Sequence, residues 1–173
     1  NVAKALGITR EQCDVFAYQS QQKWADATAK GYFDKEIIPV NIPQKRGKPD
    51  IIVDKDEHPR ADTSLDKMAS MRTLYEDGVV TAANASGIND GAAALVIGSR
   101  AYGEQHELKP MARILGGASA GVEPSMMGLG PVPACQKLLK RLGLTLQQMD
   151  IIEVNEAFSA QVLGGLKQLG IAE

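Results

Sequence analysis

Residues 81–97 read TAANASGINDGAAALVI, and the second half of this stretch decides the fold. Residues 91–97 carry no charge, which is typical of a strand buried on both faces of a sheet. Downstream, the pattern predicts strands and helices in alternation, an order that favours an α/β protein with a helix-covered sheet. The predicted strands are 91–97, 111–115 and 150–154, and the predicted helices are 99–106, 131–142 and 156–169.

Residues 1–78 have a different texture, charged and rich in turns, and are interpreted as a long excursion from that sheet. Thr9 with Gln12 is a capping box that opens a helix, and Gly31 ends this helix. Two short β-rich runs then flank a basic turn, interpreted as a solvated loop, and a further helical turn follows. These segments are 36–42, 44–50, 50–54 and 65–72.

Composition excludes several classes of protein. Apolar residues make up 44% and charged residues 23% of the chain, and the net charge of −2 gives no reason to expect nucleic acid or an anionic membrane as partner. No apolar run approaches the roughly 20 residues that span a bilayer. Cys13 and Cys135 share no metal-ligand spacing with His58 or His106, so no metal site is predicted. Low cysteine content fits a reducing compartment, and a cytoplasmic location is expected.

The segment Val154-Asn155-Glu156-Ala157-Phe158 joins the last predicted strand to the last predicted helix. Ligands of α/β sheets gather at the carboxyl ends of strands, where free helix N–H groups stabilise developing negative charge. An Asn side chain there can hold a water in an oxyanion hole. Asn155 could equally be a simple helix cap, and the residues alone leave both interpretations open.

Two further segments could line a ligand site. Small residues at 81–91 allow an extended ligand to lie against the backbone beside the Ser86 hydroxyl, although tight packing explains them equally well. Met126 and Met127, before Gly128, could line an adaptable apolar tunnel or belong to an ordinary loop. Both histidines are interpreted as surface residues and both cysteines as buried structural residues.

Taken together, these segments resemble the thiolase family. TAANASGINDGAAALVI is similar to the thiolase stretch that ends the coenzyme-A-binding loop region and enters the first core domain. GVEPSMMGLGPVPA is similar to the segment that opens the second core domain, and VNEAFSAQ to the family's NEAF motif. Order and spacing also match over essentially the whole chain, and the closest likeness is to acetyl-CoA acetyltransferases.

The resemblance implies a layered αβαβα fold of which this chain holds a part. Residues 1–85 would form the coenzyme-A-binding loop region, 86–108 the end of the N-terminal core domain and 109–173 the start of the C-terminal core domain. The residue roles that it implies are oxyanion-water binding by Asn155, pantetheine contact by Ser86, tunnel lining by Met127 and Phe158, and adenine-end contact by Arg60. Ala85 is also expected among the residues that bind coenzyme A. Carbonyls of Ala82, Ala83 and Ala85 match those that bind potassium in one family type, but that type has a Tyr where this chain has Gln21.

The resemblance also implies a function for the complete protein. It would condense two acetyl-CoA molecules to acetoacetyl-CoA and coenzyme A through an acetyl-cysteine, need no cofactor, and form a homotetramer. The nucleophilic Cys is expected before Asn1, and the catalytic His and second Cys after Glu173; neither Cys13 nor Cys135 matches them. A 3-ketoacyl-CoA thiolase of broader chain length and a non-catalytic coenzyme-A- or lipid-binding module remain alternatives.

Overall fold

A computed structural model describes residues 1–45 and 47–171, which form two compact units. The α2 unit comprises Val2–Gly87 and Glu156–Gly164. The α5 unit comprises Asn1, Ile88–Asn155 and the C-terminal residues from Gly165. The division falls within α6 (Ser159–Leu169), so each unit is described by itself.

The α2 unit is built around α2 (Arg10–Ala29), a 20-residue helix that the sequence predicts. The Thr9 hydroxyl accepts a bond from the Gln12 N–H and the Gln12 side chain accepts one from the Thr9 N–H, which confirms the capping box. Gly31 follows with a φ of +70°, a backbone conformation that favours glycine at a helix end. Both ends of this helix are therefore specified by neighbouring residues, the Thr9–Gln12 capping box and Gly31.

A small hydrophobic cluster covers the first turns of α2. Its buried members come from the loop after α1 (Val2–Leu6), from α2 and from the start of α6, and half-buried neighbours surround them. These residues are Ile8, Cys13, Ala160 and Leu163, with Ala3, Leu6, Phe16 and Val79 packed against them. Burial of each large apolar side chain contributes about 1.5–3 kcal/mol, so this cluster fixes α6 on α2.

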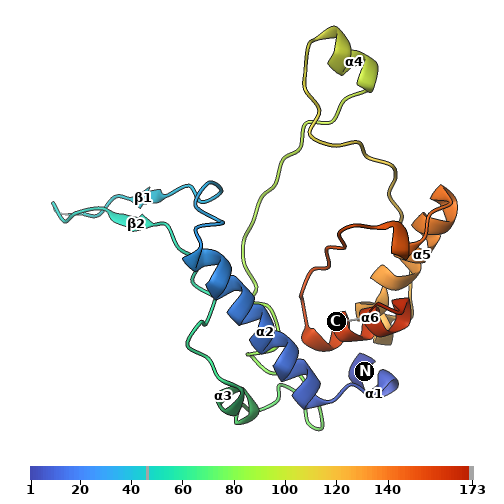
Figure 1. Cartoon of the computed structure of the whole chain (residues 1–173). Helices are drawn as coiled ribbons and strands as arrows, with labels where there is room; N and C mark the ends of the chain where they lie inside the picture. Colours follow the sequence, from blue (N-terminus) through green and yellow to red (C-terminus); the bar gives the residue numbers. More distant parts are fainter. Residues whose placement is uncertain (46, 172–173) are drawn as a thin grey trace. The chain divides into compact units, whose positions relative to one another are not determined.

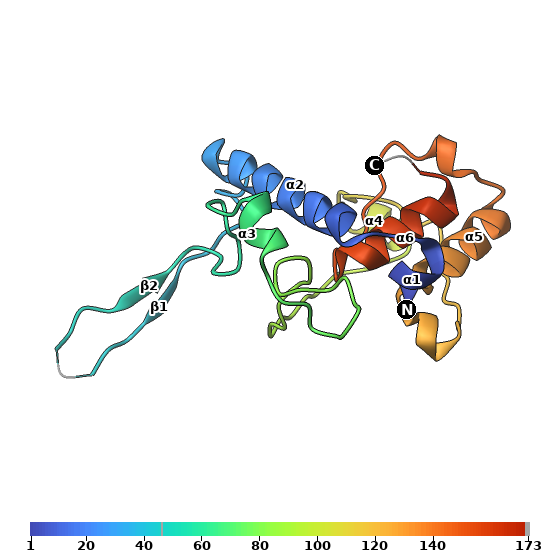
Figure 2. The same cartoon turned by 90° about the horizontal axis from the view of Figure 1, so that it is seen from below.

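Two shorter elements complete the α2 unit (Figures 1 and 2). Helix α3 (Leu65–Ala69) begins at Ser64, whose hydroxyl accepts a bond from the Lys67 N–H, and it lies beside α2. Strands β1 (Val40–Ile42) and β2 (Ile51–Val53) pair antiparallel, with Asn41 opposite Ile52, and project as a hairpin. Both elements confirm predictions, although β1 is shorter than the predicted run 36–42, and Arg46 of the basic turn lies outside the described residues.

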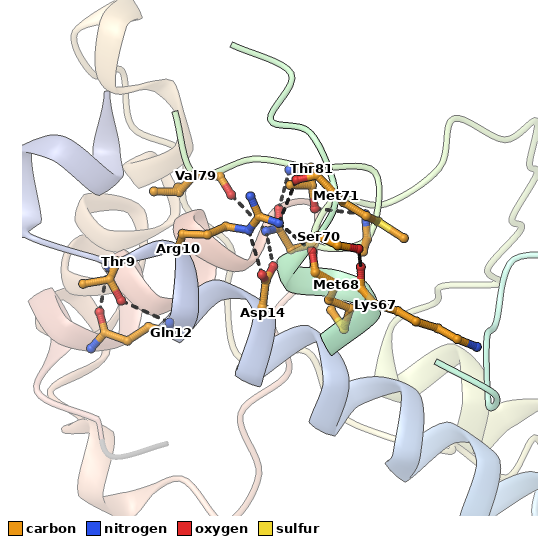
Figure 3. Close-up of polar contacts among 12 residues, drawn as sticks. Thr9, Arg10, Gln12, Asp14, Lys67, Met68, Ser70, Met71, Val79 and Thr81 are labelled. Carbon is orange, nitrogen blue, oxygen red and sulfur yellow. Dashed lines mark hydrogen bonds and ion pairs between the residues drawn. The ribbon is translucent and has the colours of Figure 1, made fainter. Parts of the chain in front are cut away.

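A buried polar network joins α2, α3 and the segment after α3 (Figure 3). The Arg10 guanidinium donates to Asp14 Oδ2 at 2.7 Å and to the carbonyls of Met68 and Met71 at 2.6 and 3.1 Å. The other carboxylate oxygen of Asp14 accepts a bond of 2.8 Å from the Asn84 amide. Asp14 is only 4% exposed, so the cost of burying its carboxylate must be offset by these two donors, Arg10 and Asn84.

The α5 unit contains helices at the predicted places. Ser99 caps α4 (Arg100–Gln105), and α5 (Pro131–Leu142) begins with a proline and ends at Gly143, which has a φ of +66°. Two short 3₁₀ helices precede and follow α5; these are η1 (Pro124–Leu129) and η2 (Leu146–Gln148). The Arg141 side chain donates to the Gly117 carbonyl and thereby fixes the chain before η1 on α5.

The predicted strands 91–97, 111–115 and 150–154 are wrong as descriptions of this chain. All three segments are irregular and mostly exposed, and α4 lies between two long extended stretches (Figure 1). Val96 and Met111 are each 103% exposed. A strand exists only where a neighbour accepts its backbone hydrogen bonds, and within the described residues the only named strands are β1 and β2. The side chains suit a buried sheet, but this chain pairs none of these segments.

Two acid-to-amide substitutions in α2 separate buried from exposed ion pairing. Asp14→Asn removes the charge opposite Arg10, whereas Asp26→Asn removes the same i,i+4 charge opposite Lys30 at an exposed position. We expect Asp14→Asn to lower the free energy of unfolding by about 3 kcal/mol, and Asp26→Asn by about 0.5 kcal/mol or less. Urea unfolding measures both values. Equal losses would contradict the role assigned to the buried carboxylate.

Candidate functional site

The Ser86 segment is held by a turn that Asn84 closes. The Asn84 side chain accepts a bond of 2.9 Å from the Thr81 N–H and donates to the Val79 carbonyl at 2.9 Å. Thr81 is fully buried, and its hydroxyl accepts a bond from the Ala83 N–H. The small residues of this segment therefore serve backbone packing here, and they leave Ser86 exposed at its end.

The same segment pairs with the start of α6. Ala85 and Phe158 form an isolated antiparallel bridge, flanked by bonds from the Ser86 N–H to the Ala157 carbonyl (2.9 Å) and from the Ser159 N–H to the Asn84 carbonyl (3.0 Å). Three of the predicted coenzyme-A-binding residues, Ala85, Ser86 and Phe158, are thus brought together. Phe158 is 41% exposed.

Arg60 lies on a loop of the same unit. Its N–H donates to the Gln21 side chain of α2 at 2.7 Å, and its guanidinium donates to the Glu57 and Pro59 carbonyls. Gln21 therefore positions the loop backbone, while the Arg60 guanidinium is bonded to carbonyl groups of its own loop.

His58, on this loop, is a contact that sequence reasoning missed. A Cβ atom on Gly87 would lie 2.1 Å from His58 Cε1, so the imidazole occupies the space that a side chain would need. The contact brings the Arg60 loop next to Ser86. No spacing rule connects His58 with Gly87, and the only local signal of a close approach is the glycine itself.

The structure bears on one of the two interpretations of Asn155, the helix cap. It is exposed, no strand precedes it, and α6 begins only at Ser159, so Asn155 does not cap this helix. The helix-cap interpretation is therefore wrong. The reason is that the Ala85–Phe158 bridge holds residues before Ser159 extended and delays the helix. Asn155 belongs to the α5 unit, and its role in an oxyanion hole stays a prediction.

Met127 also belongs to the α5 unit, in η1 rather than in a loop. It is 70% exposed, whereas Met126 lines an open groove of about 640 Å³ between η1, α5 and the end of α6. The other lining residues are Val122, Leu129, Val132, Pro133, Gln136 and Gln168. The tunnel-lining role of Met127 stays a prediction.

Known protein families match both the N-terminal and the C-terminal part of the chain. The family model described as thiolase, N-terminal domain, matches residues 1–101, and the thiolase, C-terminal domain, model matches residues 108–173. The chain belongs to the thiolase family. A beta-ketoadipyl-CoA thiolase of Acinetobacter baylyi is 53% identical over all of this chain, and an acetyl-CoA acetyltransferase of Chromobacterium violaceum is 49% identical over 98% of it.

Solved thiolase structures confirm the predicted fold class. The Bacillus anthracis acetyl-CoA acetyltransferase matches 99% of this chain with a TM-score of 0.91 and 43% identity. Human mitochondrial 3-ketoacyl-CoA thiolase matches 99% with a TM-score of 0.89 and 43% identity. The chain spans 43% of the length of each of these four relatives. It therefore carries part of a layered thiolase fold, in which the segments 91–97, 111–115 and 150–154 are still unpaired here.

The described residues hold neither a cluster of metal ligands nor a helix suited to crossing a membrane. Across residues 1–45 and 47–171, no group of three or more His, Cys, Asp and Glu side chains could hold a metal ion. Over the same residues, no helix combines the length and apolar character that crossing a bilayer requires.

Cys13 is fully buried and Cys135 half-buried, and neither is placed as a nucleophile. Burial, reinforced by the negative charge of Asp14 and partly offset by Arg10, raises the pKa of the Cys13 thiol from 9.0 to about 11. A thiol is nucleophilic as its thiolate, so Cys13 is inert at neutral pH. The interpretation of Cys13 as a structural residue is confirmed.

Thiol alkylation tests the state of Cys13. At pH 8 we expect iodoacetamide to modify Cys135 first and Cys13 only after unfolding, as read by mass spectrometry of the peptides. The pKa of the Cys13 thiol is higher in the folded than in the unfolded protein. The protonated thiol therefore contributes its full stability to the folded state below pH 9, and this contribution is lost as the pH rises toward 11. Cys13→Ala should flatten this fall in unfolding free energy. Rapid modification of Cys13 in the native protein would contradict its burial.

Proposed function

We propose that this chain supplies the coenzyme-A cradle and one oxyanion-hole residue of a complete thiolase that transfers acyl groups between coenzyme A and carbon. The observation that carries the proposal is the bridge of Ala85 with Phe158, beside the exposed Ser86. Ala85, Ser86 and Phe158, which are all expected to contact coenzyme A, lie close together here, and this proximity supports the proposal. The family membership of both matched regions supports the same reading.

The proposed reaction needs groups besides those of this chain. A Cys thiolate would attack acetyl-CoA and keep the acetyl group, and coenzyme A would leave as a thiol with a proton from a second Cys. This second Cys, now a thiolate, would take a proton from the α-carbon of another acetyl-CoA. The resulting carbanion would attack the acetyl-cysteine, forming the carbon–carbon bond and freeing the first Cys as a thiolate. A His and a water held by Asn155 would stabilise the enolate oxygen. Thiolysis is the reverse of these steps.

The role of Asn155 can be tested in the complete enzyme. Asn155→Ala should lower kcat by about 10²–10³-fold and change KM little, because the held water meets charge that appears in the transition state. Thiolysis kinetics measure both parameters, and Asn41→Ala, a change at an exposed asparagine of β1, is the control. Unchanged kcat would remove Asn155 from the mechanism.

Two compounds are candidates for the preferred substrate of the complete enzyme. The sequence resemblance favours acetoacetyl-CoA. The names of several relatives favour 3-oxoadipyl-CoA: the Acinetobacter baylyi protein at 53% identity, and an Escherichia coli protein named 3-oxoadipyl-CoA/3-oxo-5,6-dehydrosuberyl-CoA thiolase at 48%. We propose 3-oxoadipyl-CoA as the preferred substrate, which agrees with the alternative of a thiolase that takes chains longer than two carbons.

A substrate series separates these candidates. The complete enzyme should cleave both compounds, with kcat/KM at least about tenfold higher for 3-oxoadipyl-CoA, because a site that binds the terminal carboxylate is left with unpaired groups by an uncharged chain. An uncharged 3-oxohexanoyl-CoA of equal length is the matched control. A preference for acetoacetyl-CoA would return the substrate to the two-carbon type. Calorimetric binding of coenzyme A without turnover of any compound would instead favour the non-catalytic module.

Assembly and location are part of the same proposal. We propose a cytoplasmic homotetramer. The resemblance to the thiolase family supports this assembly.

A further inference from the structure

Asn84 takes part in two sets of hydrogen bonds, one through its side chain and one through its main chain. Its side chain binds Asp14, the Thr81 N–H and the Val79 carbonyl, with distances of 2.8–2.9 Å. Its main-chain carbonyl accepts the Ser159 N–H at 3.0 Å. The residue is 4% exposed and therefore touches no ligand itself.

The side-chain bonds connect Asn84 to a rigid support. Asp14 lies in the second turn of α2 and is held by Arg10, whose guanidinium also caps the carbonyls of Met68 and Met71 at the end of α3. A carboxylate with two donors cannot shift without exposing an unpaired buried charge. The position of Asn84 is thus fixed by two helices that contribute no residue to the predicted coenzyme-A contacts.

The main-chain bonds transmit this position to the candidate site. Ser86 follows Asn84 by two residues, and its N–H donates to the Ala157 carbonyl. The bridge between Ala85 and Phe158 lies between the two bonds. Displacement of Asn84 would therefore move the Ser86 hydroxyl and the Phe158 ring together.

We propose that Asn84, anchored by Asp14, is a positioning residue for binding of the coenzyme-A moiety. The inference rests on the proposed function, because Ser86 and Phe158 are its predicted contacts. Asn84 acts by holding the two contacting segments in register with each other. A residue that only stabilised the fold would affect unfolding without changing the affinity for coenzyme A.

The test compares variants of the complete thiolase that contains this chain. Asn84→Ala should raise KM for acyl-CoA roughly tenfold, the equivalent of one hydrogen bond of about 1.4 kcal/mol, and leave kcat within about threefold. Ser86→Ala should raise KM similarly, and the double variant should be no worse than about either alone, because both act on one contact. Asn41→Ala is the control for loss of an exposed asparagine.

An exchange of the two side chains guards against loss of folding. Asn84→Asp sets a second carboxylate against Asp14 and should be worse than Asn84→Ala. D14N/N84D restores a donor–acceptor pair at this contact and keeps an acceptor for the Thr81 N–H. It leaves the Val79 carbonyl without its donor and Arg10 without a charged partner at position 14, so recovery is expected to be incomplete. Partial recovery of KM by the exchange supports the proposal. No recovery relative to Asn84→Asp overturns it.

Hydrogen–deuterium exchange gives a readout that does not need activity. The peptide that contains Ser86 should exchange faster in Asn84→Ala than in the unmodified protein, because the Ser86 N–H loses its bond to Ala157. Lower thermal stability with unchanged KM and unchanged exchange of this peptide would show a purely structural role and overturn the proposal. Absence of thiolysis in the unmodified enzyme would refute the proposed function instead, and the exchange result would still decide whether Asn84 holds the segment.

Discussion

The α2 unit depends on one buried carboxylate. Asp14 is held between the Arg10 guanidinium and the Asn84 amide, and through them it joins the end of α3 to the segment before Ser86. Removing a carboxylate from water costs several kcal/mol, and the two hydrogen bonds offset this cost only while both donors stay in place. The geometry of the Ser86 segment is therefore specified by an electrostatic requirement and only secondarily by apolar packing.

Apolar packing at this end of α2 is limited in extent, which gives the polar network its weight. The buried cluster has four members, Ile8, Cys13, Ala160 and Leu163, and Cys13 directly precedes the charged residue. That neighbour contributes to the raised pKa of the Cys13 thiol, after burial itself. A side chain in this position is suited to filling space and unsuited to nucleophilic chemistry. The polar network therefore also affects the chemical role of Cys13.

Features encoded by neighbouring residues could be predicted from sequence, and features that need distant partners could not. The Thr9 capping box, the Ser99 cap and the Pro131 start of α5 each depend on residues within one helical turn. The bond between Asp14 and Asn84 joins positions 70 residues apart and has no local signal. For the candidate site, the sequence indicated the segment around Ser86, but neither its pairing with Phe158 nor the contact of His58 with Gly87 was predictable.

The unformed strands follow from the same distinction. Residues 91–97 have the composition of a strand covered on both faces, yet a strand forms only with a hydrogen-bonded neighbour, and among residues 1–45 and 47–171 none pairs with this segment. Matching thiolases are more than twice as long, with the same order of motifs over the shared part. Helices form here because their hydrogen bonds are internal, whereas sheet formation waits for a neighbouring strand. In the α2 unit, Ala85, Ser86 and Phe158 are held together by hydrogen bonds that involve neither β1 nor β2.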